Sequence, residues 1–173
     1  MTILKGSKFM LRPYRYGDEL SIAEQANNEN VSRSLLLLPH PYILEDAEQW
    51  VERNVQMAEQ EFPEELNFAI EVNDKTVGSI SLTDIVLGHK AEIGYWLGEE
   101  YWGRGIMTEA VKLLTKYAFE ELDLVRVYAG VFVWNKASQA VLGKAGFHLE
   151  GTHEKGICKN GEFMDDHTYA KVC

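Results

Sequence analysis

The chain has few residues that could cross-link the fold by disulfide bridges or bind a metal ion. It contains two cysteines, Cys158 and Cys173, among its 173 residues, and neither lies in a C-x-x-C pair. The five histidines show none of the spacings typical of zinc sites. A single disulfide bridge would constrain a chain of this length little. We therefore expect two reduced thiols, a cytoplasmic protein and no bound metal.

Long apolar runs and an excess of basic residues are also missing. The longest apolar stretch covers about eight residues near 127–134, whereas a helix that spans a bilayer needs about 20. Lysine and arginine number 17 against 27 aspartates and glutamates, so the formal charge is −10. Because binding to a phosphate backbone needs a basic surface, we expect no nucleic-acid partner. Because no apolar run is long enough to span a bilayer, we expect no membrane partner either.

What remains is the composition of an ordinary globular domain. Hydrophobic residues make up 46% and charged residues 25% of the chain, as in typical folded proteins. At about 150 residues per domain, the length suits one domain. No repeat and no long linker rich in serine, glycine or proline interrupts it. We therefore expect a single continuous domain over residues 1–173.

Apolar spacing predicts four helices and about seven strands. Helices are expected where apolar residues recur every three to four positions, and strands where β-branched and aromatic residues alternate or cluster. The expected helices cover residues 18–28, with Asp18 as N-cap, 46–60, 105–122 and 137–145. The expected strands cover residues 9–13, 66–72, 77–83, 92–97, 125–133, 147–155 and 163–172. The order β-α-α-β-β-β-α-β-α-β-β indicates the mixed α+β class.

The most informative segment runs from Glu92 to Ala110, EIGYWLGEEYWGRGIMTEA. It combines a strand, a loop with two glycines and the start of a helix, whose free N–H groups attract anions. Gly103 and Gly105 have no Cβ and allow a phosphate to approach, while Arg104 can add a guanidinium. The same glycines also suit a tight turn between strand and helix, and the sequence leaves both interpretations open.

This segment resembles the pyrophosphate loop of the GNAT superfamily of acyl-coenzyme A-dependent N-acyltransferases, whose pattern is [QR]-x-x-G-x-[GA]. Gly105 matches the central glycine, whereas Trp102 and Met107 depart from the two outer preferences. The surrounding string is similar to the RimJ/RimL-type branch, which acetylates protein N-terminal amines among other substrates. The strings NKAS at 135–138 and KAGF at 144–147 also fit that branch. The similarity is loose only over residues 28–66.

The resemblance implies a GNAT fold with a mixed central sheet of about seven strands flanked by about four helices. It also implies acetyl-coenzyme A as co-substrate, in a gap between the fourth and fifth strands. There, backbone groups of Trp96, Leu97 and Gly98 would meet the pantetheine arm, with the Trp96 N–H facing the thioester oxygen. The remaining cofactor-binding residues implied are Gly103, Arg104, Gly105, Ile106, Met107, Thr108 and Asn135.

The resemblance also suggests a base and an acid. Glu92 lies where some GNAT enzymes place a glutamate that acts through water. Its alternative is a strand carboxylate paired with a neighbouring lysine or arginine. Many GNAT enzymes protonate the leaving thiolate with a tyrosine, but Leu142 occupies that position here. RimJ/RimL-like chains use the serine of N-x-x-S instead, which is Ser138. Its alternative is a helix-capping hydroxyl.

Three functions follow. The first is acetylation of a primary amine, above all the N-terminal α-amine of a protein or peptide. The second is acetylation of a polyamine or another small amine, and the third is a non-catalytic acyl-coenzyme A-binding module. The acidic run over residues 45–65 either attracts a cationic acceptor or is only a solvated helix face. The branch also suggests a possible homodimer.

Overall fold

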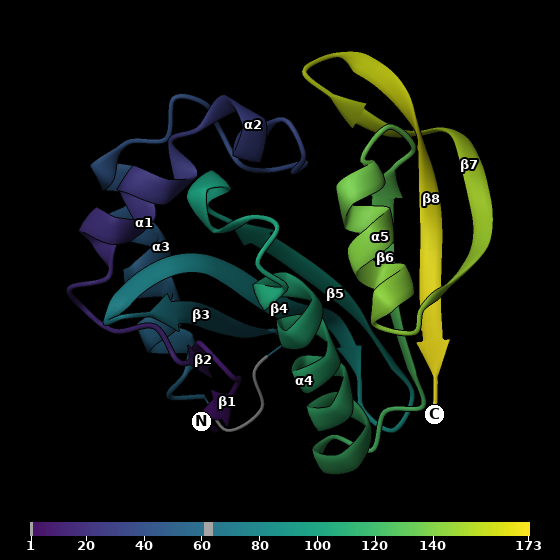
Figure 1. Ribbon diagram of the computed structural model, residues 1–173, viewed down its shortest axis with the longest axis horizontal. Coiled ribbons are helices and arrows are strands. Elements are labelled where there is room, and N and C mark those ends of the chain that lie inside the picture. Colours follow the sequence, from purple (N-terminus) through teal and green to yellow (C-terminus); the bar gives the residue numbers. More distant parts are fainter. Residues whose placement is uncertain (1, 61–63) are drawn as a thin grey trace.

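One mixed sheet forms the centre of the protein (Figure 1). The computed structural model describes residues 2–60 and 64–173. The strand order is β1-β2-β3-β4-β5-β6-β8-β7. The strands are β1 (Leu4–Lys5), β2 (Met10–Arg12), β3 (Leu66–Val72), β4 (Lys75–Val86), β5 (Lys90–Leu97), β6 (Arg126–Phe132), β7 (His148–Lys159) and β8 (Glu162–Val172). The helices are α1 (Glu19–Ala26), α2 (Glu29–Ser32), α3 (Leu44–Met57), α4 (Ile106–Glu121) and α5 (Lys136–Lys144), with a 3₁₀ turn η1 (Glu99–Tyr101).

The predicted α+β class and all of the predicted helices and strands are confirmed. The structure adds β1 and α2, which have two and four residues and are too short to show a period in the sequence. It also lengthens β4, which continues to Val86 beyond an irregularity in its pairing with β5. Residues 35–42, which lie between α2 and α3, contain no helix or strand.

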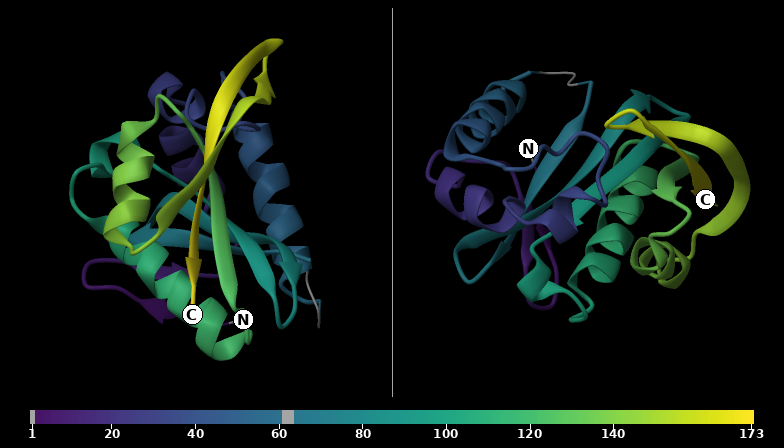
Figure 2. Two further views of the ribbon diagram at one scale, coloured as in Figure 1. Left: turned by 90° about the vertical axis from the view of Figure 1, so that its right-hand side faces the viewer. Right: turned by 90° about the horizontal axis from the view of Figure 1, so that it is seen from above.

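Helices cover both faces of the sheet, with α4 and α5 on one side and α1 and α3 on the other (Figure 2). Successive side chains of a strand point to opposite faces. On β5, Ile93, Tyr95 and Leu97 therefore pack in the core beneath α4 and α5. Trp96 packs with the second apolar cluster, beside α1 and α3. None of the helices described is long and apolar enough to cross a membrane.

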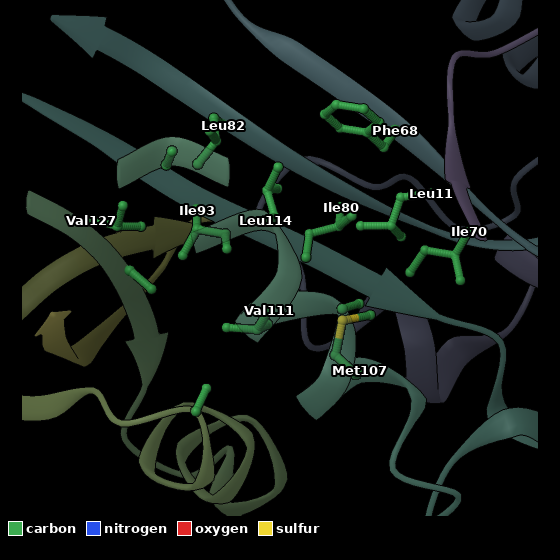
Figure 3. Close-up of a cluster of buried hydrophobic side chains, with 14 of the residues drawn as sticks. Leu11, Phe68, Ile70, Ile80, Leu82, Ile93, Met107, Val111, Leu114 and Val127 are labelled. Carbon is green, nitrogen blue, oxygen red and sulfur yellow. The ribbon is translucent and has the colours of Figure 1, made fainter. Parts of the chain in front are cut away.

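The main core lies between the sheet and α4 (Figure 3). Leu11, Phe68, Ile80 and Leu82 on the strands are fully buried against the apolar face of this helix. That face includes Leu114, which has no exposed surface. Burying a side chain of this size contributes roughly 1.5–3 kcal/mol. The core therefore fixes α4, and with it the loop that precedes the helix.

A buried ionic cluster joins β2, β3 and the start of α1. The Arg12 guanidinium donates to Asp18 at 2.7 Å and to Glu71 at 2.5 Å, and Thr76 also donates to Asp18 at 2.9 Å. Asp18 precedes α1 as predicted, but its side chain makes no capping hydrogen bond. The capping prediction for Asp18 was wrong in this respect because a buried arginine competes for the carboxylate and holds it in the sheet.

Strands β5 and β6 separate after a short parallel stretch. They pair only from Lys90 to Glu92 on β5 and from Arg126 to Tyr128 on β6. Beyond Glu92, β5 remains paired with β4, while β6 remains paired with β8. The sheet therefore has a gap in its middle, between the second half of β5 and the second half of β6 (Figure 1).

Candidate active site

The β5 edge of this gap carries free backbone groups. The Gly98 N–H donates to Val77 on β4 at 2.8 Å. Hydrogen-bonded pairs alternate along an antiparallel ladder, so the Trp96 N–H points to Ser79 on β4. The groups that face the gap are those of Tyr95 and Leu97, and of these the Leu97 carbonyl already accepts a hydrogen bond from the Trp102 indole. The Trp96 N–H, which was expected to face the thioester oxygen, therefore points away from the gap, whereas the N–H groups of Tyr95 and Leu97 point into it.

The loop that follows β5 leads into the N-terminus of α4. Gly105 is the N-cap of α4 with φ 80°, and Gly103 in the same loop has φ 72°. A Cβ on either glycine would have no neighbour within 4 Å. The positive φ angles alone therefore explain why glycine occupies both positions. The open space above them also leaves room for an anion.

The first N–H groups of α4 are the donors available to such an anion. The first helical bond runs from Glu109 N–H to the Gly105 carbonyl, so the N–H groups of residues 106–108 have no partner within the helix. The side chains of Ile106 and Met107 are buried in the core, which leaves only their backbone for a ligand. Thr108 is half-buried, and Arg104 is exposed with its guanidinium 5.2 Å from the Tyr101 ring centre.

Two contacts that the sequence did not predict hold this loop. The Trp102 indole donates to the Leu97 carbonyl at 2.7 Å, which fixes the loop against the end of β5. The carboxylate of Glu109, in the first turn of α4, accepts from the Ser7 N–H at 2.7 Å and from the Ser7 hydroxyl at 2.6 Å. Glu109 is thus bound by the N-terminal segment and does not cap the free N–H groups.

Ser138 lies across the gap from β5. Asn135 is the N-cap of α5, and its side-chain oxygen accepts from the Ser138 N–H at 3.1 Å. The capping role considered for Ser138 therefore belongs to Asn135. The Ser138 hydroxyl instead lies 2.8 Å from the Tyr95 hydroxyl on β5. Burial raises the pKa of Tyr95 to about 12, so the phenol stays protonated.

Glu92 stands at the point where the gap begins. It is half-buried, and burial raises the pKa of its carboxyl group. A hydrogen bond from the Gly130 backbone opposes this shift, and the negative charges of Asp84 and Asp166 add to it. Among the described residues, no lysine or arginine forms an ion pair with Glu92. The alternative of a paired structural carboxylate is therefore not what is observed.

Glu92 and Ser138 approach the gap from opposite faces of the sheet. Glu92 is an even number of residues from Trp96 on β5 and shares its face, beside α1 and α3. Tyr95, which contacts Ser138, belongs to the core beneath α4 and α5. A carboxylate and a hydroxyl thus lie on the two sides of one opening.

Helix α2 lies beside this opening and is held at both ends. Near its start, Asn28 and Asn30 donate to Glu99 of η1 at 2.7 and 3.0 Å. At its other end, the Lys159 ammonium on β7 donates to the carbonyls of Ser32 and Leu35 at 2.5 Å each. The helix therefore bridges η1 and the β7–β8 hairpin, as the arrangement at the top of Figure 1 indicates. No sequence signal marked these residues.

The remaining candidates have mainly structural roles. Trp50 and Trp96 pack against the second core cluster. Within the acidic run, the Asp46 carboxylate accepts from the Ile43 N–H at 2.9 Å, and Glu65 pairs with Arg53. Glu45 and Glu48 are exposed at the start of α3. Residue 61 of the run lies outside the described residues.

Comparison with known proteins agrees with the geometry. The family described as an acetyltransferase (GNAT) domain matches residues 8–148. The probable N-acetyltransferase YjcK of Bacillus subtilis is 36% identical over 97% of this chain and 96% of its own length. The ribosomal-protein-serine acetyltransferase of Escherichia coli is 32% identical over 74% of this chain and 71% of its own. The crystal structure of the microcin C7 self-immunity acetyltransferase MccE, in complex with acetyl-CoA and AMP, superposes with a TM-score of 0.85 and 27% identity, covering 97% of this chain and 94% of that one.

The chain belongs to the GNAT acetyltransferase family. It is an acetyl-CoA-dependent N-acetyltransferase, and its relatives include a ribosomal-protein acetyltransferase, as the resemblance to RimJ/RimL predicted. The residues present fit the co-substrate. The unpartnered N–H groups at the start of α4 suit its pyrophosphate, and the free β5 backbone suits its pantetheine arm.

Proposed function

We propose that this enzyme acetylates the N-terminal α-amine of a protein or peptide. The observation that carries the proposal is Glu92, a half-buried carboxylate with a raised pKa and no described basic partner, at the opening of the gap. A base of this kind removes a proton most easily from an amine of low pKa. The similarity to a ribosomal-protein-serine acetyltransferase supports the same class of acceptor.

The protonation of the acceptor favours an α-amine over a lysine side chain. At pH 7, an α-amine with a pKa of about 8 is neutral in roughly one molecule in ten, whereas a lysine amine with a pKa of about 10.4 is neutral in roughly one in a few thousand. A general base typically contributes about 10²–10⁴-fold to a rate. An α-amine therefore demands much less of Glu92.

Each residue then has a distinct task. Acetyl-CoA supplies the activated acetyl group as a thioester. Glu92 accepts the proton that the amine must lose, directly or through one water molecule. The free N–H groups on the gap side of β5 polarise the acetyl carbonyl, an effect typically worth about 10²–10³ in rate. The Ser138 hydroxyl supplies a proton to the departing sulfur from the opposite face.

A matched set of acceptors tests the proposal. Thiol release would be measured with a peptide whose α-amine is free, the same peptide blocked at its N-terminus but carrying a lysine, and spermidine. We expect the free α-amine to give the highest kcat/KM. Preference for spermidine would replace the proposal by the small-amine alternative. Coenzyme A binding without turnover of any of these amines would favour the non-catalytic module.

Charge provides a second test of the acceptor. The exposed Glu45 and Glu48 lie near the start of α3, directly after residues 28–42, which in this fold would wall the amine entrance. Acidic groups at an entrance attract cations, and salt screens this attraction beyond about 8 Å at physiological ionic strength. We expect kcat/KM for a basic peptide to fall with salt in the wild type, and the double variant Glu45→Gln, Glu48→Gln to flatten that dependence. Asp46 is left unchanged because it caps the helix. An equal response with a neutral peptide would reduce these acids to a solvated helix face.

A homodimer and a cytoplasmic location remain part of this proposal. Sedimentation of the purified chain over a range of concentrations would test the first, and fractionation of cells that express it would test the second.

A further inference from the structure

The hydroxyl groups of Tyr95 and Ser138 form a pair at the edge of the gap. Their oxygen atoms are 2.8 Å apart, the distance of a good O–H···O hydrogen bond. Tyr95 lies on β5 at the edge of the gap, and its ring packs in the core beneath α4 and α5. Ser138 is held from the other side, since its N–H donates to Asn135 at the start of α5. Both partners are thus fixed by elements that the core holds rigid.

The direction of this hydrogen bond decides what Ser138 can do. A serine hydroxyl has one hydrogen to donate and lone pairs that can accept a second hydrogen bond. Among the described contacts of the Ser138 hydroxyl, the side-chain partner is Tyr95. The other acceptor within reach of the phenol is the Ser138 carbonyl, at 3.4 Å, which is a much weaker contact. At 2.8 Å either hydroxyl can be the donor, and donation by the phenol is the arrangement that keeps the serine hydrogen available for another acceptor.

We propose that Tyr95 is a positioning residue that donates its hydrogen bond to Ser138 Oγ and leaves the serine hydrogen free for the sulfur of coenzyme A. The inference rests on the proposed role of Ser138 as the acid. During transfer, the Oγ–H bond breaks, the S–H bond forms, and the electron pair of the broken bond stays on Oγ. The Tyr95 hydrogen stabilises that charge until solvent water returns a proton to Ser138. Glu92 gives its own proton to solvent, so the cycle balances.

Tyr95→Phe removes only the hydroxyl, so the ring can keep its packing. We expect kcat to fall about tenfold, which is the loss of one hydrogen bond of ordinary net strength. The acetyl-CoA Kd should stay unchanged. In the Ser138→Ala background, Tyr95→Phe should have no further effect on kcat, because Tyr95 acts through Ser138. Tyr117→Phe is the matched control, since Tyr117 is another half-buried tyrosine of the same core, on α4 and outside the gap.

A second measurement needs no acceptor. The thiol pKa of bound coenzyme A can be titrated by the ultraviolet absorbance of its thiolate in the binary complex. A serine hydrogen bond to sulfur stabilises the thiolate, so Ser138→Ala should raise this pKa. Tyr95→Phe should raise it in the same direction by a smaller amount, and Tyr117→Phe should leave it unchanged.

The outcomes separate this inference from the proposed acceptor. A wild-type thiol pKa and kcat in Tyr95→Phe would overturn the role of Tyr95, whichever amine is the substrate. Additive effects of Tyr95→Phe and Ser138→Ala would also overturn it, because the two residues would then act independently. A poor α-amine acceptor combined with the expected shift in thiol pKa would contradict only the acceptor proposal.

Discussion

Replacing Gly105 by alanine tests the loop before α4 most directly. Gly105 is the N-cap of the helix with φ 80° and ψ −4°, in the left-handed region that side chains disfavour. A Cβ there would meet no atom within 4 Å. Steric clash is therefore excluded, and any effect of Gly105→Ala comes from the backbone conformation alone.

The expected loss of stability is small but has a definite sign. A non-glycine residue in the left-handed region costs about 1–2 kcal/mol. Alanine also restricts the unfolded chain, which returns about 0.4–1 kcal/mol. The mid-range values of these two effects combine to a net loss of about 0.8 kcal/mol, which lowers Tm by about 2–3 °C in a domain of this size. Gly143→Ala is the control, because Gly143 lies in α5 and also has open space around it. It should raise Tm by a similar amount, since glycine within a helix costs about 0.5–1 kcal/mol.

Cofactor binding gives the second half of the test. If the loop relaxes to relieve the strain, the free N–H groups at the start of α4 turn away and the pyrophosphate loses its donors. Gly105→Ala should then weaken binding of coenzyme A in titration calorimetry, while S-acetylpantetheine, which has no pyrophosphate, should bind as it does to the wild type. Gly143→Ala should change neither affinity.

Two results would refute this reasoning. If both alanine variants shift Tm in the same direction, the left-handed conformation of Gly105 is not what sets the cost. If Gly105→Ala weakens coenzyme A and S-acetylpantetheine equally, the loop does not act on the pyrophosphate, and its glycines serve only the turn.

Three further predictions concern charged groups. Glu92→Gln should lower kcat about 10²-fold or more. In the wild type, kcat/KM should fall at acidic pH with a midpoint above the usual pKa of a glutamate, because burial raises the pKa of Glu92. The variant should lack this fall. A raised carboxyl pKa means that stability falls as pH rises through it, so the same variant should raise Tm at neutral pH; a lower Tm would mark a structural carboxylate. Arg12→Met leaves the buried Asp18 and Glu71 without their central partner and should cost about 3–5 kcal/mol in urea unfolding; a loss below about 1 kcal/mol would contradict this. Lys159→Met releases the end of α2 and should raise KM for the acceptor several-fold with an unchanged acetyl-CoA Kd in calorimetry; an unchanged KM would separate α2 from the acceptor.

The order of elements and the glycine-containing loop before α4 could be predicted from the sequence. The pairs of apolar residues from 106 to 118 give α4 a wide buried face, and periodicity reports such a face directly. Gly103 and Gly105 mark the loop because positive φ selects glycine locally. The string NKAS identified Asn135 and Ser138 together, since a capping residue and the helix it starts are neighbours in the chain.

Tertiary structure alone decided which side chains meet. Asp18 is bound by Arg12 instead of capping α1, because the sheet buries a guanidinium beside it. Tyr95 and Ser138 are 43 residues apart and meet only because β5 and α5 pack on the same core. Glu92 lies on the opposite face of the sheet because successive side chains of β5 point to opposite faces. It lies at the start of the gap because β5 stops pairing with β6 at this residue. Local propensity depends on neighbours in the chain, whereas the site depends on contacts between distant segments, and these exist only once the sheet has formed.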